Sequence, residues 1–214
     1  MDRDVRVRAD TARYTQDVPA DRELIQIVDA ALAEAARRSG TWLACRIGCT
    51  DCCHGVFDIS RLDAERLRAG LSELESRDPE KAAAVRRRAR EAVLRLAADF
   101  PGDSATGLLA EDEAAERRFD DFANGEPCPA LDAESGGCDL YSSRPMICRT
   151  FGPAIRHESG EISTCELCYA GATDEQIASC AVSIKTHDLE SKLIVQAENE
   201  TGLRGNTIVA FCLA

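Results

Sequence analysis

The chain has 214 residues and a mass of 23.2 kDa, enough for one domain or two small ones but not for a large multidomain enzyme. Apolar residues make up 44% and charged residues 30%, so we expect a packed core and exclude general disorder. A net charge of -12 at pH 7 would repel a polyanion, so nucleic acid is not expected as a partner.

Hydrophobic periodicity and capping residues predict a mainly α fold of several helices, with few short strands. Ser60 is a suitable N-cap for the second helix, and Asp78-Pro79 is a typical start for the third. Thr173-x-x-Gln176 forms a capping box before the last helix. The predicted helices cover residues 21–39, 61–76, 79–100, 111–122 and 173–202.

Alternation typical of strands is scarce, and the best candidates are Val56 to Ile59 and Thr207 to Phe211. We expect the helices to be organised around cysteine-rich metal-binding loops within one domain, residues 1–214. Its parts are expected to be cysteine-cluster loops at 45–59 and 122–170, a helical insertion at 60–121 and a C-terminal helix at 173–202.

The sequence shows no segment that would bind a membrane. No stretch approaches the roughly 20 apolar residues that span a bilayer, and the opening MDRDVRVRAD lacks the apolar run of a secretory signal. We therefore expect a cytoplasmic protein with no membrane partner. Disulfides rarely persist in a reducing compartment, so the eleven cysteines indicate metal or redox chemistry.

The first cysteine cluster, Cys45, Cys49, Cys52 and Cys53, has two or three residues between successive thiols, apart from one adjacent pair. A short loop of this kind can close around one ion, because metal–sulfur bonds are only about 2.3 Å long. Gly48 would give the backbone the freedom to fold back. Neighbouring side chains diverge, so Cys52 and Cys53 either serve two sites or include one spare, reactive thiol.

The second cluster, Cys128, Cys138 and Cys148, has spacings of ten and ten, so the fold must bring these thiols to a shared site. Arg144 and Arg149 flank Cys148 and are predicted to offset the negative charge of a thiolate–metal centre and to lower the thiol pKa values. The alternative is that they pair with surface acids, and this applies more to Arg144 than to Arg149.

Cys165-Glu-Leu-Cys168 has the spacing of a zinc knuckle, and a redox dithiol is the alternative. Cys180 and Cys212 lie in helix-like or apolar surroundings and are predicted to be buried structural thiols. Glu166 and Asp139 border cysteines and could act as a base, but nothing in the sequence singles out a catalytic residue. The three histidines form no catalytic arrangement with a serine or cysteine.

The two clusters together resemble the YkgJ-like zinc- or iron-chelating CxxCxxCC family. The resemblance covers about residues 45–152 and implies about eight metal-binding cysteines, of which seven positions match and the eighth is Cys165 or Cys168. Flagellin lysine methylases, which are thought to use an iron–sulfur cluster, are similar in part, but this chain is short for such an enzyme. The residues that carry the resemblance are Cys45, Cys49, Cys52, Cys53, Cys128, Pro129, Leu131, Cys138, Tyr141, Arg144, Pro145, Cys148 and Arg149.

Three functions follow as hypotheses. The first is a protein that coordinates zinc or iron through thiolates from both clusters, with the metal tying helices together. The second is an enzyme with an iron–sulfur or other metal centre that carries redox or alkyl-transfer chemistry. The third is a structural adaptor stapled by zinc. The predicted metal ligands are Cys45, Cys49, Cys52, Cys53, Cys128, Cys138, Cys148, Cys165 and Cys168, supported by Arg144 and Arg149.

Overall fold

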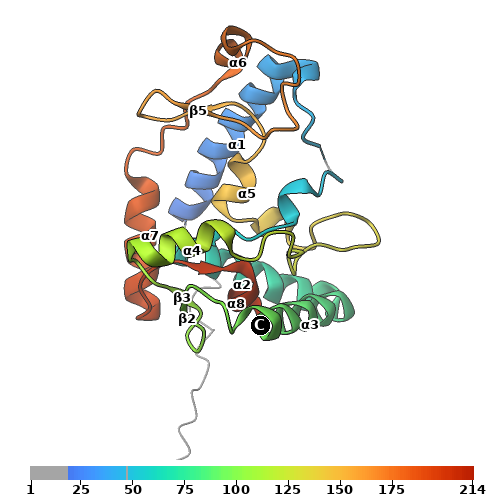
Figure 1. Ribbon diagram of the computed structural model, residues 1–214, viewed down its shortest axis with the longest axis vertical. Helices are drawn as coiled ribbons and strands as arrows, with labels where there is room; N and C mark the ends of the chain where they lie inside the picture. The colour runs from blue at the N-terminus through green and yellow to red at the C-terminus, as the bar shows by residue number, and fades with distance from the viewer. Residues whose placement is uncertain (1–18, 47) are drawn as a thin grey trace, which may run out of the picture.

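Eight α-helices, joined by two-residue strands and by loops, make up the part of the chain that the computed structural model describes, residues 19–46 and 48–214 (Figure 1). The expected mainly α fold is confirmed. The first ten residues, on which the expectation about a secretory signal rests, lie outside the described part. The helices are α1 (Pro19–Ser39), α2 (Arg61–Arg77), α3 (Pro79–Leu96), α4 (Glu113–Asp121), α5 (Met146–Thr150), α6 (Asp174–Cys180), α7 (Leu189–Thr201) and α8 (Val209–Leu213).

The strands form three small antiparallel pairs, β1 with β6, β2 with β3 and β4 with β5. Short 3-10 turns cover Gly40–Trp42, Asp51–Cys53 and Tyr141–Ser143. The strands are β1 (Asp58–Ile59), β2 (Gly102–Asp103), β3 (Leu108–Leu109), β4 (Ile155–Arg156), β5 (Ile162–Ser163) and β6 (Thr207–Ile208).

Three helices begin where the capping residues predict. The Ser60 hydroxyl accepts a hydrogen bond from the Asp63 N–H, 3.2 Å away, at the start of α2. Asp78 caps α3, which opens with a proline, and Thr173 forms a complete capping box with Gln176 at the start of α6. Each cap satisfies an N–H that has no partner inside its helix.

The predicted helix over 173–202 is wrong, because it is divided into α6 and α7 by an extended segment. Val182 forms a parallel bridge with Ile155, and its N–H donates to the carbonyl of Ala154 at 3.1 Å. Asp188 then adopts a left-handed conformation, with φ of 61°, directly before α7. Pairing with β4 therefore outweighs the helical periodicity of this segment.

Other boundaries also differ from expectation. The third helix stops at Leu96, four residues before Phe100. The predicted strand over Thr207 to Phe211 is a strand only at Thr207–Ile208, where it pairs with β1. From Val209 the chain turns into α8, because its side chains pack against α2 and α3.

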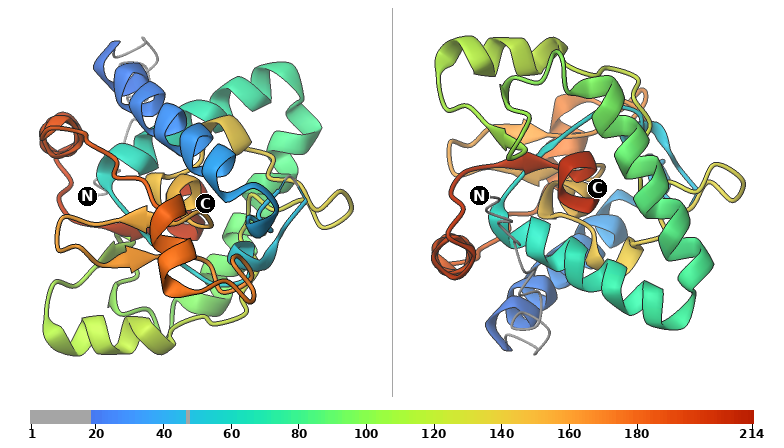
Figure 2. Two further views of the ribbon diagram at one scale, coloured as in Figure 1. Left: turned by 90° about the horizontal axis from the view of Figure 1, so that it is seen from above. Right: turned by 90° about the horizontal axis from the view of Figure 1, so that it is seen from below.

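The main core lies where α2, α3 and α8 meet. Figure 2 shows α2 and α3 as the two arms of a V with α8 between them. Leu71 and Leu74 from α2 pack there with Val85 from α3 and Leu213 from α8, all nearly inaccessible to solvent. The segment 60–121, expected as a helical insertion, thus supplies two walls of this core.

A buried charge network connects the scaffold to the cysteine-bearing segments. Arg66 on α2 forms ion pairs with Asp63 on the same helix and with Asp21 on α1. The other role of Asp63 is to accept a hydrogen bond from the Met146 N–H, 3.0 Å away, at the start of α5. The short helix that carries Cys148 is therefore fixed to both α1 and α2.

In the described residues, no helix has the length and apolar character needed to cross a membrane.

Candidate metal centre

The two cysteine clusters are joined by backbone hydrogen bonds between the segments at 53–55 and 126–128. The Cys128 N–H donates to the Cys53 carbonyl at 2.8 Å, and the Gly55 N–H donates to the Glu126 carbonyl at 2.8 Å. These hydrogen bonds directly follow the turn Asp51–Cys53, so the first cluster lies directly beside the second. Residues 75 positions apart in sequence are thereby neighbours.

A tight loop brings Cys138 back towards Cys128. Leu131 and Cys138 form an antiparallel bridge, and the Asp139 N–H donates to the Ala130 carbonyl at 2.8 Å. The Asp139 carboxylate, 4% exposed, is paired with Arg88 of α3 at 2.6 Å and with Lys81 at 3.5 Å. Asp139, considered as a base from sequence, therefore fixes the loop to α3.

The two predicted arginines differ in their surroundings. Arg149 is buried, and its guanidinium donates to the Asp29 carboxylate, to the Ser142 carbonyl and to the Arg144 carbonyl. Arg144 lies over the ring of Tyr141, with its Cζ 3.8 Å from the ring centroid. Arg149 therefore holds the backbone that carries Arg144.

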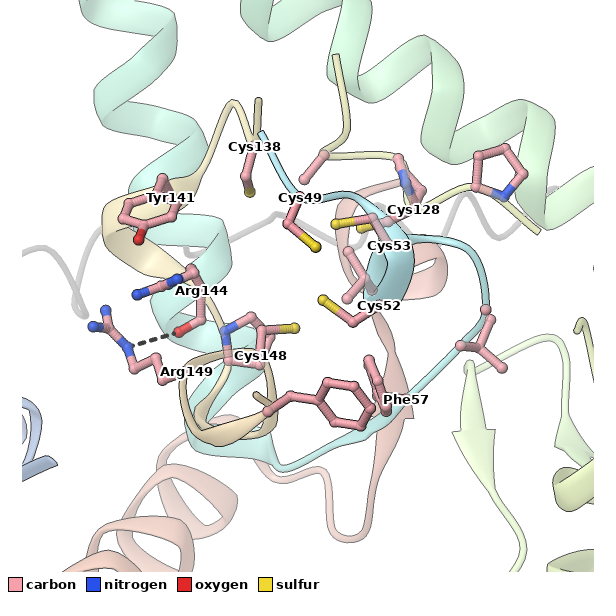
Figure 3. A pocket seen from close by; sticks show the side chains of 18 of the residues that line it. Cys49, Cys52, Cys53, Phe57, Cys128, Cys138, Tyr141, Arg144, Cys148 and Arg149 are labelled. Atoms are coloured by element: carbon pink, nitrogen blue, oxygen red, sulfur yellow. Dashed lines mark hydrogen bonds between the residues drawn. The ribbon is translucent and has the colours of Figure 1, made fainter. Parts of the chain in front are cut away.

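Seven of the nine predicted ligands line one cavity of about 280 Å³. Figure 3 shows thiols of both clusters surrounding a common space, with Cys49 and Cys52 on one side and Cys138 and Cys148 opposite. The structure therefore gathers thiols that the sequence separates by more than 100 positions. The cavity cysteines are Cys45, Cys49, Cys52, Cys53, Cys128, Cys138 and Cys148.

The other two predicted ligands, Cys165 and Cys168, are buried in an adjacent apolar cluster outside the cavity lining. Gly152 brings Cys45 close to them: a Cβ at this glycine would lie 3.2 Å from the Cys45 Sγ, and its carbonyl accepts from the Cys165 N–H at 3.2 Å. With φ of +129°, this position also requires glycine for conformational reasons.

The segment after Cys168 is anchored by a buried chain of hydrogen bonds. The Tyr169 hydroxyl accepts from the Ala154 N–H at 2.8 Å and lies 2.7 Å from the Ser39 hydroxyl. Since Ser39 donates to the Ala35 carbonyl, Tyr169 is the donor to Ser39. These contacts tie the Cys165–Cys168 turn to the end of α1.

The remaining cysteines and the histidines do not line the cavity. The Cys180 thiol donates to the Arg38 carbonyl, and the Cys212 thiol donates to the Ala64 carbonyl. Both are buried, as expected. All three histidines are exposed and none lines the cavity.

Burial dominates the electrostatics of the thiols. It raises the pKa of Cys128 to about 11, and it also raises the pKa values of Cys138 and Cys148. Arg144 lowers the pKa of Cys138, as expected, but burial outweighs it. For Cys52, the main cause of a raised pKa is its hydrogen bond with Cys53, followed by burial. Burial therefore favours the neutral, protonated form of Cys128, Cys138 and Cys148.

The neighbouring thiols that raise the pKa differ between Cys45 and Cys148, and Cys52 is common to both. After burial, the Cys45 thiol is affected by Cys168, Cys49, Cys52 and Cys165, whereas the Cys148 thiol is affected by Cys128, Cys52 and Cys138. In residues 19–46 and 48–214, no group of three or more Cys, His, Asp or Glu side chains is already arranged to hold a metal ion. Coordination by both clusters therefore stays a prediction.

The donor set nevertheless suits a soft metal. Thiolates select zinc, iron or iron–sulfur clusters over hard cations such as magnesium and calcium. Seven thiols around one space exceed the four that a single tetrahedral ion requires.

Sequence reasoning missed the apolar wall of the cavity. Phe57 and Phe151, whose ring centroids are 5.4 Å apart, both line it, together with Val56 and Val209. The sequence could have indicated that the two phenylalanines line the site, because each lies within four residues of a predicted ligand. Val209 gives no such signal, since only tertiary packing brings it to the site.

Comparison with protein-family models gives a match over residues 44–169 to CxxCxxCC, described as "Putative zinc- or iron-chelating domain". The match spans both clusters and includes Cys165 and Cys168. A search of curated proteins gave no match. A search of solved structures gave none either.

Proposed function

Because the chain belongs to the CxxCxxCC family of zinc- or iron-chelating domains, we propose that it binds zinc or iron through thiolates of both cysteine clusters. The observation that carries this proposal is the gathering of seven cysteines from separate segments around one cavity. The ligands are proposed to come from nine cysteines: Cys45, Cys49, Cys52, Cys53, Cys128, Cys138, Cys148, Cys165 and Cys168.

The proposed ligands fall into an inner and an outer group. The inner group is Cys52, Cys128, Cys138 and Cys148, and the outer group is Cys45, Cys49, Cys165 and Cys168. The thiols that raise the pKa of Cys148 are the other three of the inner group, and those that raise the pKa of Cys45 are the other three of the outer group together with Cys52. Each group has the four thiols of a tetrahedral site. Cys53, hydrogen-bonded to Cys52, is then the spare thiol beside the inner group.

Arg144 and Arg149 are proposed to support the centre in different ways. Arg144 supplies a positive charge close enough to Cys138 to lower its pKa. Arg149 acts on the backbone, because its hydrogen bonds hold residues 142 and 144. A reducing, cytoplasmic environment is proposed as well, and the presence of all eleven cysteines as free thiols is consistent with it.

Elemental analysis of anaerobically purified protein tests the metal proposal. We expect zinc or iron at one or two equivalents, with loss of metal in Cys128→Ser and Cys148→Ser. The matched controls are Cys180→Ser and Cys212→Ser, which change thiols outside the cavity and should keep the metal. A folded wild-type protein without stoichiometric zinc or iron would overturn the proposal.

An enzyme with an iron–sulfur or other metal centre is the second candidate, and the cavity beside the thiols favours it. A saturated structural site needs no adjoining space, whereas a catalytic one keeps a position open to substrate. An absorption band at about 400 nm in the anaerobic protein would identify an iron–sulfur cluster, whereas a colourless protein with bound metal would identify zinc.

A further inference from the structure

The cavity beside the thiols is large enough for an organic ligand in addition to metal. Its volume of about 280 Å³ is close to the lower end of the roughly 300–1,000 Å³ typical of ligand pockets. Two ions held by sulfur at about 2.3 Å would use only part of that space. The lining also includes the apolar side chains of Val56, Phe57, Leu96, Phe151 and Val209.

One charged group on the cavity wall lacks a partner. The Arg144 Nε is buried and has no hydrogen-bond partner, and within residues 19–46 and 48–214 its guanidinium makes no hydrogen bond or ion pair. No thiol accepts a hydrogen bond from it. Its contact is the stacking on Tyr141, which orients the guanidinium plane and leaves its N–H groups free. Figure 3 shows this side chain beside Tyr141 at the edge of the thiol-lined space.

The position of Arg144 is fixed by other contacts. Its carbonyl accepts from the Arg149 Nε at 3.2 Å, and Arg149 is itself paired with Asp29. Pro145 follows directly, and the next N–H is held by Asp63. The backbone is therefore preorganised while the guanidinium stays available, an arrangement that lowers the entropic cost of binding.

We propose that Arg144 binds the carboxylate of a small monocarboxylic acid whose apolar body lies against the Phe57–Phe151 wall. A guanidinium recognises a carboxylate through two parallel N–H···O bonds. A phosphate monoester carries up to two negative charges, and the cavity offers one unpartnered arginine beside a ring of thiols on a chain of net charge -12. The inference deepens the proposed function and rests on it, because the ligand would lie beside the metal-binding sulfur atoms.

Calorimetric titration of the full chain, as purified with its metal, tests the proposal with hexanoate, hexanamide and hexyl phosphate. We expect hexanoate to bind about tenfold or more tightly than its neutral amide, and Arg144→Gln to remove that difference. Arg144→Lys should restore part of it, because it keeps the charge without the two-pronged geometry. Arg46→Gln is the matched control, since Arg46 also lines the cavity but is exposed and donates to the Ala44 carbonyl.

Hexanoate binding that is absent, or equal in wild type and Arg144→Gln, would overturn the proposal. Tighter binding of hexyl phosphate would overturn the argument for a single negative charge. Elemental analysis of the same samples separates this result from the proposed function. Bound metal without bound hexanoate contradicts the carboxylate site alone, whereas hexanoate bound through Arg144 without any metal contradicts the metal proposal alone.

Discussion

The helical scaffold of α2, α3 and α8 and the cysteine loops are stabilised by different interactions. In the scaffold, Leu71, Leu74 and Val85 are enclosed by apolar neighbours, and Cys212 behaves as one more small apolar residue. In the loops, the backbone turns through glycines with positive φ such as Gly48, and the thiols are only partly buried around a cavity. A cysteine enclosed by packing needs no further ligand, whereas the cavity cysteines still have a free face for one.

This contrast predicts that apolar burial stabilises the scaffold without metal, whereas the loops gain their order from the bound ion. Metal binding would then contribute to the folding free energy of the loops. Four measurements can break or sharpen this distinction.

The largest effect is expected from protons that compete for the loop sulfur atoms. Burial raises the pKa values of Cys128, Cys138 and Cys148, so near pH 7 the metal must displace a proton from each. Metal affinity should rise about tenfold per pH unit for each proton released, and so about 10,000-fold per pH unit where four thiols lose their protons. Competition with a chelator between pH 6 and 8, corrected for the chelator's own protonation, measures this. An affinity that does not change with pH would contradict thiolate ligation.

The scaffold should respond to a cavity in its core and not to metal. Leu74→Ala removes a side chain that is 3% exposed and should lower the free energy of unfolding by about 2–5 kcal/mol. Urea unfolding of the metal-free protein measures the change. Leu94→Ala is the control, because Leu94 is 81% exposed and its loss should cost less than about 0.5 kcal/mol. Equal effects of the two variants would refute the assigned core.

A smaller loss is expected where the Cys165–Cys168 turn is tied to α1. Tyr169→Phe leaves the buried Ala154 N–H without its acceptor and should cost about 1–3 kcal/mol. Tyr141→Phe serves as control, because Tyr141 is 47% exposed and its ring remains under Arg144. Thermal unfolding compares the two variants. A Tyr169→Phe protein as stable as wild type would show that this hydrogen-bond chain does not hold the turn.

The smallest effect is expected at the start of α6. Thr173→Ala removes the side chain that accepts the Gln176 N–H and should cost about 1 kcal/mol. Gln176→Ala removes only the returning half of the capping box and should cost less. Both are read from the midpoint of thermal unfolding. A larger loss for the glutamine variant would reverse the assigned importance of the two hydrogen bonds.

The parts of the fold that could be predicted, such as the starts of three helices, depend on signals within a few adjacent residues. Ser60, Asp78 and Thr173 cap helices because a side-chain acceptor next to a free N–H is a property of a few adjacent residues. The break between α6 and α7 could not be predicted in this way. It depends on Val182 pairing with Ile155, a contact that the periodicity of the segment does not encode.

The candidate site shows the same limit. Close spacing identified four of the cavity cysteines, Cys45, Cys49, Cys52 and Cys53, because thiols a few residues apart are informative in themselves. The other three, ten positions apart, were assigned through the family resemblance. The different surroundings of Arg144 and Arg149 could not be read from their similar positions around Cys148. Arg149 is held by Asp29, which lies 120 positions away on α1. Only the tertiary structure shows which of the two guanidinium groups is still available.

The pairing of β1 with β6 has a consequence for the order of biosynthesis. Asp58 follows the first cysteines closely, yet its side chain accepts a hydrogen bond from Asn206, 148 positions later. On the ribosome, the first thiols emerge long before the strand that supports them, and contacts of such long range form slowly. The pairing of β1 with β6 beside the first cluster can therefore form only after translation has passed residue 208, and the proposed binding of metal is expected to follow it.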